Sequence, residues 1–375
     1  MNSTDKLFLL DAYALIYRSY YAFIKNPRIN SKGFNTSAIL GFVNTLEEVL
    51  KKENPTHIGV AFDPSGPTFR HEAYEQYKAQ REETPEAIRL SVPIIKDIIR
   101  AYRIPILEVS GYEADDVIGT LATEAGRQGI ITYMMTPDKD YGQLVSDNVF
   151  MYRPKHSGGF EVMGIEEIKN KFNIRSTEQV IDMLGLMGDS SDNIPGCPGV
   201  GEKTAQKLVA EFGSIENLLA HTDQLKGALK TKVEANREMI TFSKFLATIK
   251  VDVPIKLDMT TLVREEPDEE KLRKIFEELE FRTLIDRVLK KSGAPLSSSS
   301  NSVSPDLYAG TLFARPVDSP TPENNGPVQG DLFANFADNG TGNAENSNLT
   351  HLEMLDVDYQ LIDTCLLYTS PSPRD

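Results

Sequence analysis

Acidic side chains follow three apolar segments of the sequence at comparable positions. Asp11 comes after Leu-Phe-Leu-Leu, Asp63 after an apolar run at 57–62, and Asp138 after another at 130–136. If these segments are parallel strands, their carboxyl ends meet at one edge of a sheet, where ligands bind in open α/β folds. A single aspartate in such a place is often only a helix cap. Three at matching positions favour a shared chemical site.

Six further carboxylates stand in three short motifs, GYEADD, TPDKD and GDSSDN, and they are Glu113, Asp115, Asp116, Asp140, Asp189 and Asp192. Nine carboxylates gathered without bases would repel one another and raise one another's pKa. Divalent cations resolve that repulsion, and oxygen ligands without His or Cys favour Mg²⁺ or Mn²⁺ over zinc. The pattern therefore predicts a site for two or more Mg²⁺ or Mn²⁺ ions.

A glycine-rich segment, IPGCPGVGEKTAQKLV, precedes a predicted helix. Its candidate phosphate-binding residues are Gly196, Gly199, Gly201, Lys203 and Thr204. Glycines allow close approach to the backbone, and N–H groups at a helix N-terminus bind phosphate. The alternative is an ordinary helix–turn–helix corner. The lysines on the following turns favour a phosphate clamp, which would act without sequence specificity because the backbone makes the contact.

A basic stretch dotted with aromatic residues lies between Asp63 and Glu113. Its cations include Arg70, Lys78 and Arg81, and they alternate with rings that include Tyr74 and Tyr77. In isolation this pattern is typical of a solvated amphipathic helix. Beside an acidic metal site it would supply cations for phosphate and rings on which unpaired bases can stack.

The charge of the chain is unevenly distributed. The sequence has 375 residues and a formal net charge of −15, of which residues 301–375 contribute −9. The first 300 residues therefore carry −6, which argues against nucleic acid because phosphate binding relies on Lys and Arg. Setting aside the nine candidate metal ligands changes that value to +3. The composition is thus compatible with a nucleic-acid enzyme.

The sequence also indicates a cellular compartment. No apolar run approaches the ~20 residues of a membrane span, and no basic leader surrounds the apolar stretch that Asp11 interrupts. The two cysteines, Cys197 and Cys365, cannot form a disulfide framework, and no Cys/His cluster has zinc spacing. We expect a cytoplasmic protein without a membrane partner.

Strand and helix signals alternate along the first part of the chain. Strands are expected at 6–10, 57–62, 104–109 and 130–136, with helices up to about residue 23 and at about 36–52, 85–102 and 113–127. This alternation predicts an α/β fold with a mostly parallel sheet. After about residue 170 the strand signal ends and short helices follow to about residue 291.

The C-terminal part has a different composition. Residues 292–350 are rich in Ser, Asn, Pro, Gly and Asp, which predicts a disordered linker. Within it, Gln329, Leu332 and Phe333 resemble the short peptide by which bacterial replication proteins hold the sliding clamp. Chance is the alternative, since such loosely specified positions recur easily in polar linkers.

Five motifs together resemble the 5′-nuclease (5′–3′ exonuclease) domain of bacterial DNA polymerase I, within the flap-endonuclease family. They are Asp11, FDPSGPTFRHEAYEQYKAQR, GYEADDVIGTLA, TPDKDYGQLV and LMGDSSDNIPGCPGVGEKTA, in that order. The resemblance implies a PIN-like (resolvase-like) catalytic domain over residues 1–172 and an all-α helix–three-turn–helix DNA-binding domain over 173–291. Residues 351–375 resemble the start of a truncated 3′–5′ exonuclease-like domain with a non-native tail, so polymerase activity is expected to be absent.

The resemblance also implies roles for individual residues. The nine carboxylates become metal ligands, with Asp63, Glu113 and Asp115 at one ion, helped by Asp11 through water. Asp138, Asp140 and Asp192 lie near the other. Lys78, Arg81 and Asp116 are expected to act in catalysis, the first two as cations of a helical arch. Arg18 matches a phosphate contact, and the glycine loop can also hold a monovalent ion such as K⁺.

The expected function is a structure-specific 5′ nuclease that cuts 5′ flaps and nicked or RNA-primed duplexes by two-metal catalysis, in bacterial replication and repair. We expect it to act as a monomer. Two alternatives remain open: a module that binds junctions without cutting, and a PIN-type ribonuclease. The first would predict lost carboxylates, whereas the glycine loop argues against the second.

Overall fold

The computed structural model describes residues 5–155 and 158–289. Contacts divide the chain into two units, residues 1–324 and 325–375, and all described residues belong to the first. The predicted linker, the predicted segment 351–375 and the clamp-like Gln329, Leu332 and Phe333 lie outside the described residues.

A six-stranded sheet forms the centre of the described N-terminal part. Its strands are β1 (Lys6–Asp11), β2 (His57–Ala61), β3 (Ile106–Leu107), β4 (Ile131–Met135), β5 (Val149–Pro154) and β6 (Phe160–Met163). They lie in the order β3-β2-β1-β4-β5-β6, and all neighbours are parallel except β5 and β6. This arrangement confirms the predicted α/β class and the mostly parallel sheet.

Helices cover both faces of the sheet because β1 alternates its side chains between two cores. Phe8 and Leu10 belong to one core, and Leu7 and Leu9 belong to the other. The first core is covered by α1 (Ala12–Ala22), α2 (Ser37–Lys52) and α4 (Glu86–Ala101). The second is covered by α5 (Ala114–Arg127), the 3₁₀ helix η1 (Lys139–Leu144) and α6 (Ile165–Phe172).

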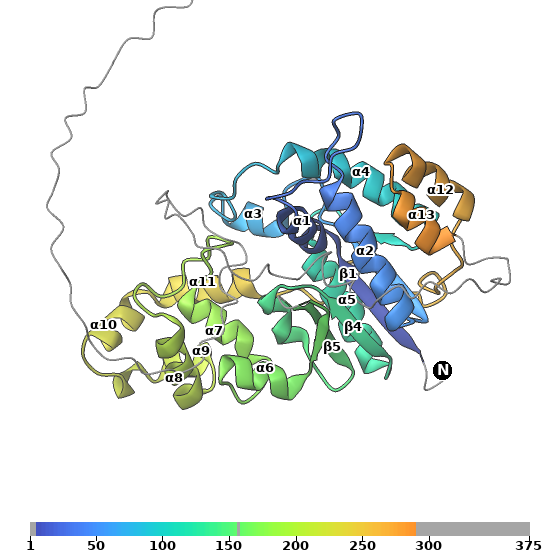
Figure 1. Cartoon of the computed structure of the whole chain (residues 1–375). Helices are drawn as coiled ribbons and strands as arrows, with labels where there is room; N and C mark the ends of the chain where they lie inside the picture. The colour runs from blue at the N-terminus through green and yellow to red at the C-terminus, as the bar shows by residue number, and fades with distance from the viewer. Residues whose placement is uncertain (1–4, 156–157, 290–375) are drawn as a thin grey trace, which may run out of the picture. The chain divides into compact units, whose positions relative to one another are not determined.

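A helical region follows the sheet, and Figure 1 shows its helices in green and yellow. It consists of α7 (Gln179–Met187), α8 (Glu202–Phe212), α9 (Ile215–Ala220), the 3₁₀ helix η2 (Thr222–Gln224), α10 (Gly227–Ala235) and α11 (Arg237–Ala247). Its buried side chains continue the core beneath α5. The helical region is therefore built onto one face of the sheet.

The last two described helices return to the other face. α12 (Glu269–Glu278) and α13 (Arg282–Leu289) pack with α2 and α4 through Leu272, Phe276 and Leu284. We expected these two helices to belong to the DNA-binding domain, but their buried side chains share a core with the sheet. No helix among the described residues is both long enough and apolar enough to cross a bilayer.

Candidate active site

The three strand-end aspartates come together because their strands are neighbours in the sheet. Asp11 is the last residue of β1, in register with Ala61 of β2, and the preceding Leu10 is in register with Met135 of β4. Asp11 also caps α1 by accepting a hydrogen bond from the Ala14 backbone N–H at 3.1 Å. Asp63 accepts one from the backbone N–H of Ala114 at 2.7 Å, which joins the end of β2 to the start of α5.

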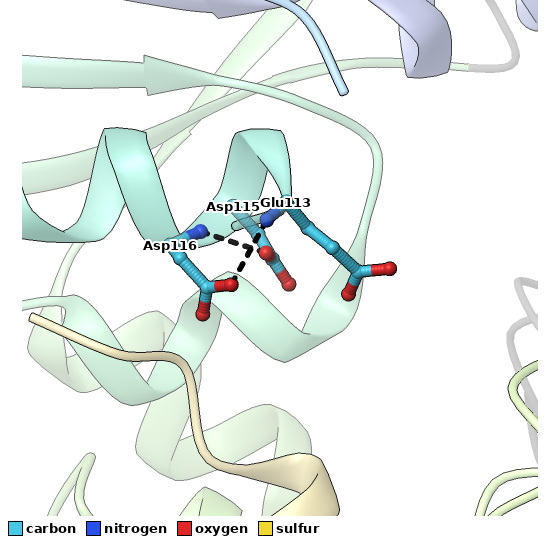
Figure 2. Close-up of side chains that lie close together, drawn as sticks. All are labelled: Glu113, Asp115 and Asp116. Atoms are coloured by element: carbon cyan, nitrogen blue, oxygen red, sulfur yellow. Dashed lines mark hydrogen bonds between the residues drawn. The ribbon is translucent and has the colours of Figure 1, made fainter. Parts of the chain in front are cut away.

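Glu113, Asp115 and Asp116 form an acidic cluster at the start of α5, shown in Figure 2. One oxygen from each lies within 4.8 Å of the others, close enough to share a metal ion. Two local hydrogen bonds hold the turn: Glu113 N donates to Asp116 at 3.1 Å, and Asp116 N donates to Asp115 at 2.7 Å. The helix N-terminus stabilises these negative charges.

The remaining acids lie at η1 and at the loop after α7. Asp138 caps η1 by accepting from the Asp140 backbone N–H at 3.0 Å. Asp140 Oδ1 is buried and has no hydrogen-bond partner. By contrast, both oxygens of Asp189 are occupied, one by Lys139 at 2.8 Å and the other by the backbone and hydroxyl of Ser191.

The raised pKa values of Asp11 and Asp140 indicate an excess of negative charge among these acids. Burial, together with the neighbouring Asp63 carboxylate, raises the pKa of Asp11 to about 7. Burial and the Asp138 carboxylate raise the pKa of Asp140 well above its usual range. A buried carboxylate oxygen without a donor, within a set of oxygen ligands, suits hard divalent cations such as Mg²⁺.

Two cations already reach into the acidic group from a segment we call the strap, residues 74–85. Lys78 Nζ lies 2.7 Å from Glu113, and Arg81 lies 2.5 Å from Asp192. Although burial alone would raise the pKa of Asp192, Lys78 and Arg81 lower it to about 2. Both basic side chains are thus placed beside the expected metal ligands.

The strap is not a helix in this structure. The helix α3 (Phe69–Ala73) ends before it, and turns follow. Lys78 has a left-handed backbone (φ 56°), and its N–H donates to the Asp192 carbonyl at 3.0 Å. A non-glycine residue in this conformation is held there by its surroundings. The strap therefore lies fastened to the loop that carries Asp192.

The predicted DNA contacts of Arg70 and Tyr77 do not fit the burial of these side chains. Arg70 was expected to bind DNA, but its side chain is buried and bonded to Glu113 and Asp116. Tyr77 was expected to stack on bases, but it is also buried, with its hydroxyl 2.9 Å from Glu113. Tyr74 is half-buried and packs edge-on against Phe242, with 5.6 Å between the ring centroids.

Arg18 lies on α1, the helix that Asp11 caps. It donates to the Lys155 carbonyl at 3.3 Å, and burial lowers its pKa to about 10. The side chain remains positively charged at neutral pH. Its contact with phosphate stays a prediction.

The glycine loop connects α7 to α8, and its glycines serve different purposes. Gly196 (φ 61°) packs directly on the backbone of Gly188, and its N–H donates to Ser243 Oγ at 2.9 Å. Gly196 is also buried, which does not fit the predicted contact with DNA. Gly199 and Gly201 are exposed.

Cations and a hydroxyl surround the exposed part of this loop. Lys203 is exposed and Thr204 half-exposed in the first turn of α8. Lys232 of α10 was missed by sequence reasoning, because it is distant along the chain. Its ammonium lies where a Cβ added to Gly199 would collide with it. Lys232 thus lies beside Gly199, and Lys203 and Thr204 follow in the first turn of α8.

The raised pKa of Asp11 predicts an unusual pH dependence of stability. A carboxyl whose pKa is higher in the folded state destabilises the metal-free fold as pH rises from about 4 to 7. Asp11→Asn should therefore increase the free energy of unfolding in EDTA at pH 8, by on the order of 2–4 kcal/mol, with little effect at pH 4. Urea unfolding at both pH values measures this.

The matched control is Asp97→Asn, since Asp97 is exposed and pairs only with Arg100 in the neighbouring turn. This substitution should leave the difference in unfolding free energy between pH 4 and pH 8 as it is in the wild type. A destabilised Asp11→Asn at pH 8 would contradict the electrostatic account of the site.

Comparisons with known proteins agree with this geometry. Residues 6–173 match the 5′-3′ exonuclease N-terminal resolvase-like domain, and residues 175–270 match the 5′-3′ exonuclease C-terminal SAM fold. A 5′-3′ exonuclease of Aquifex aeolicus is 37% identical over 76% of this chain and 95% of its own length. DNA polymerase I of Bacillus subtilis is 42% identical over 77% of this chain, but over only 33% of its own.

Solved structures share the fold. T5 5′-exonuclease with bound zinc has a TM-score of 0.55 and 22% identity over 74% of this chain and 98% of that one. The catalytic core of Rad2 in complex with DNA substrate has a TM-score of 0.52 and 20% identity over 76% of this chain and 93% of that one. The chain spans about a third of the length of the DNA polymerases that it matches. With both family domains in order and an exonuclease matched over nearly its whole length, the chain belongs to the 5′-3′ exonuclease family.

Proposed function

We propose that this chain is a structure-specific 5′ nuclease that hydrolyses phosphodiester bonds at 5′ flaps, nicks and RNA-primed junctions. The observation that carries the proposal is the acidic cluster of Glu113, Asp115 and Asp116 at the start of α5, together with the buried and unpartnered Asp140 oxygen of η1. The family membership supports the reaction, and the solved DNA complex of the Rad2 core supports the choice of DNA.

Two groups of carboxylates would hold Mg²⁺ or Mn²⁺. Asp63, Glu113 and Asp115 would hold one ion, helped by Asp11 through water. Asp138, Asp140 and Asp192 would hold the other. Two bound ions would supply an activated water and neutralise charge on the leaving 3′ oxygen. Asp189 is already neutralised by Lys139, so it fits this set less well than the others.

Lys78 and Arg81 would hold the scissile phosphate. Their present partners are Glu113 and Asp192, so both cations lie at the border of the acidic group. A fixed cation beside the reacting phosphate stabilises the negative charge that grows in the transition state. No side-chain general base is required, and no histidine lies among the proposed ligands.

The glycine loop and α8 would hold the duplex by its phosphates. Backbone N–H groups at a helix N-terminus bind phosphate without reading the base sequence. Side-chain contacts would come from Lys203, Thr204 and Lys232. A K⁺ ion bound in the loop would also attract the phosphates of the duplex. The nuclease would thus select its substrate by shape.

Lys203→Ala and Lys232→Ala should each weaken flap binding. For each variant, the loss of affinity should be the same whatever the DNA sequence. Each should also lower the salt slope of binding by about one, because each lysine releases the counterions of one phosphate. Titration of labelled flap DNA at several salt concentrations measures the slope. Lys274→Ala is the control, since Lys274 is exposed on α12, whose buried residues belong to a different core from those of the glycine loop. An unchanged slope in both loop variants would remove the loop from the duplex site.

Several wider properties belong to the same proposal. We propose that the chain acts in primer removal and repair in a bacterial cytoplasm, and the bacterial origin of the relatives that share these domains supports a bacterial setting. We propose that the chain acts as a monomer. Contact with a sliding clamp through Gln329, Leu332 and Phe333 would be tested by clamp binding of the Leu332→Ala, Phe333→Ala variant.

Cleavage of a 5′-labelled double-flap DNA tests the proposed function. Cutting near the junction with Mg²⁺ and none in EDTA is the expected result. Tight flap binding without cutting would favour the junction-binding module. Cleavage of single-stranded RNA in preference to the flap would favour the PIN-type ribonuclease.

A further inference from the structure

Arg70 is among the largest side chains that are fully buried in the described residues, at 1% exposure. A guanidinium has five N–H donors and cannot lose its charge in a protein. Such a group is buried only where every donor finds an acceptor. Its partners therefore show what the side chain does.

The five donors of Arg70 are all used, and the partners lie on two sides. On one side, Nη1 donates to Glu113 at 3.0 Å and to Asp116 at 2.8 Å, while Nη2 donates to Asp116 at 2.8 Å. On the other side, Nε donates to the Leu246 carbonyl and Nη2 to the Thr248 carbonyl, both at 2.9 Å. No donor remains for a phosphate.

The two sides belong to different parts of the fold. Glu113 and Asp116 start α5 at the edge of the sheet, whereas Leu246 and Thr248 are at the C-terminal end of α11. The last carbonyls of a helix lack partners within the helix and attract cations. Arg70 satisfies two of them and at the same time neutralises the acidic turn.

The contact continues on both sides. Asp116 also accepts a hydrogen bond from the Lys250 backbone N–H at 2.8 Å, so the chain after α11 is bound to the same carboxylate. In the other direction, Ser243 of α11 holds the glycine loop through the Gly196 N–H. The helix α11 thus contacts the acidic turn through Arg70 and the glycine loop through Ser243.

We infer that Arg70 is a positioning residue that orients the Glu113 carboxylate for metal binding and ties it to α11. This inference deepens the proposed function and rests on it. Glu113 Oε2 accepts from Arg70 and Tyr77, and its other oxygen accepts from Lys78. A lysine at position 70 would keep the charge but could not reach the acceptors on both sides, because it lacks the planar fork.

Mn²⁺ binding measured by calorimetry on the full chain, without DNA, tests the inference. Arg70→Lys should weaken Mn²⁺ binding by about tenfold, as is typical when a residue that orients a ligand is lost. Its affinity for flap DNA in EDTA should stay unchanged, since Arg70 does not contact DNA. Unchanged Mn²⁺ affinity, or lost DNA affinity in its place, would overturn the inference.

Two further variants separate positioning from folding. Phe69→Leu removes the ring 4.6 Å beneath the Arg70 guanidinium without touching a carboxylate, and it should weaken Mn²⁺ binding in the same direction by less. If Arg70→Lys does not fold, unchanged Mn²⁺ binding in Phe69→Leu overturns the inference. Lys244→Met is the matched control, because Lys244 pairs with Asp182 and Glu216 inside the helical region. It should lower stability without changing Mn²⁺ affinity.

The same data distinguish this inference from the proposed function. A wild-type chain that binds Mn²⁺ but cuts no flap would contradict the nuclease, while the calorimetric result would still decide the role of Arg70. A wild-type chain that binds no Mn²⁺ would overturn both.

Discussion

Replacing Glu113 with glutamine should lower the rate of flap cleavage by at least about a thousandfold, because several kcal/mol of transition-state stabilisation depend on the metal it helps to hold. Glu113 is 5% exposed and lies between Arg70, Tyr77 and Lys78, so glutamine keeps its volume and most of its hydrogen bonds. What it loses is the negative charge and the oxygen that accepts from Lys78. Single-turnover cleavage of the 5′-labelled flap with Mg²⁺ measures the effect.

Glu108→Gln is the matched control for this substitution. Glu108 is exposed, pairs with Lys96 at 2.6 Å, and is not among the proposed metal ligands. Surface pairs of this kind contribute little to stability, and cleavage should proceed at the wild-type rate. If Glu113→Gln also cleaves at that rate, Glu113 does not bind a catalytic metal.

Lys78→Met is the second variant with a large expected effect. We expect cleavage to slow by a factor of about 10²–10³, the usual loss when one fixed electrostatic contact to a transition state is removed. Lys78 pairs with Glu113 and approaches Asp192. The metal-free variant should therefore also be less stable than the wild type, and Mg²⁺ should restore part of that stability. Single-turnover rates and urea unfolding with and without Mg²⁺ measure both effects.

Lys96→Met provides the comparison for Lys78. Lys96 also pairs with a carboxylate and lies over an aromatic ring, that of Phe62, but on α4. It should leave the cleavage rate unchanged. A Lys78→Met variant that cuts as fast as the wild type would show that the strap does not contact the scissile phosphate.

Much of the fold follows from the sequence because the central strands are continuous apolar runs that end in acids. β1, β2 and β4 lie where the pattern predicts them, within about a residue at each end. The outer strands are harder to predict from the sequence. β3 covers only Ile106–Leu107 of the predicted 104–109, since it lies at the sheet edge and pairs on one side. β5 and β6 were not predicted, and they carry charged residues such as Arg153 and Glu161 that weaken an apolar strand signal.

The site was predictable to the same extent as the strands that carry it. Asp11, Asp63 and Asp138 come together because parallel strands end at one edge, and this can be read from spacing alone. Arg70 could not be placed this way. Arginine is rarely buried, and two of its acceptors are the backbone carbonyls of Leu246 and Thr248, which no side-chain pattern reveals.

The glycine loop shows the same limit. From the sequence, the same role is predicted for Gly196, Gly199 and Gly201. In the structure, Gly196 is required for close packing against Gly188. That contact joins two backbone segments and depends on how α7 and α11 pack. Lys232 was missed for a related reason, because only the fold brings α10 beside the loop.

The central claim is that the carboxylates at the strand ends hold two divalent cations. Anomalous diffraction from a crystal soaked in Mn²⁺ tests it most directly. The account predicts two Mn²⁺ sites about 4 Å apart, one against Asp63, Glu113 and Asp115 and one against Asp138, Asp140 and Asp192. A crystal that shows no Mn²⁺ at these carboxylates, with Lys78 and Arg81 still bonded to Glu113 and Asp192, would contradict it.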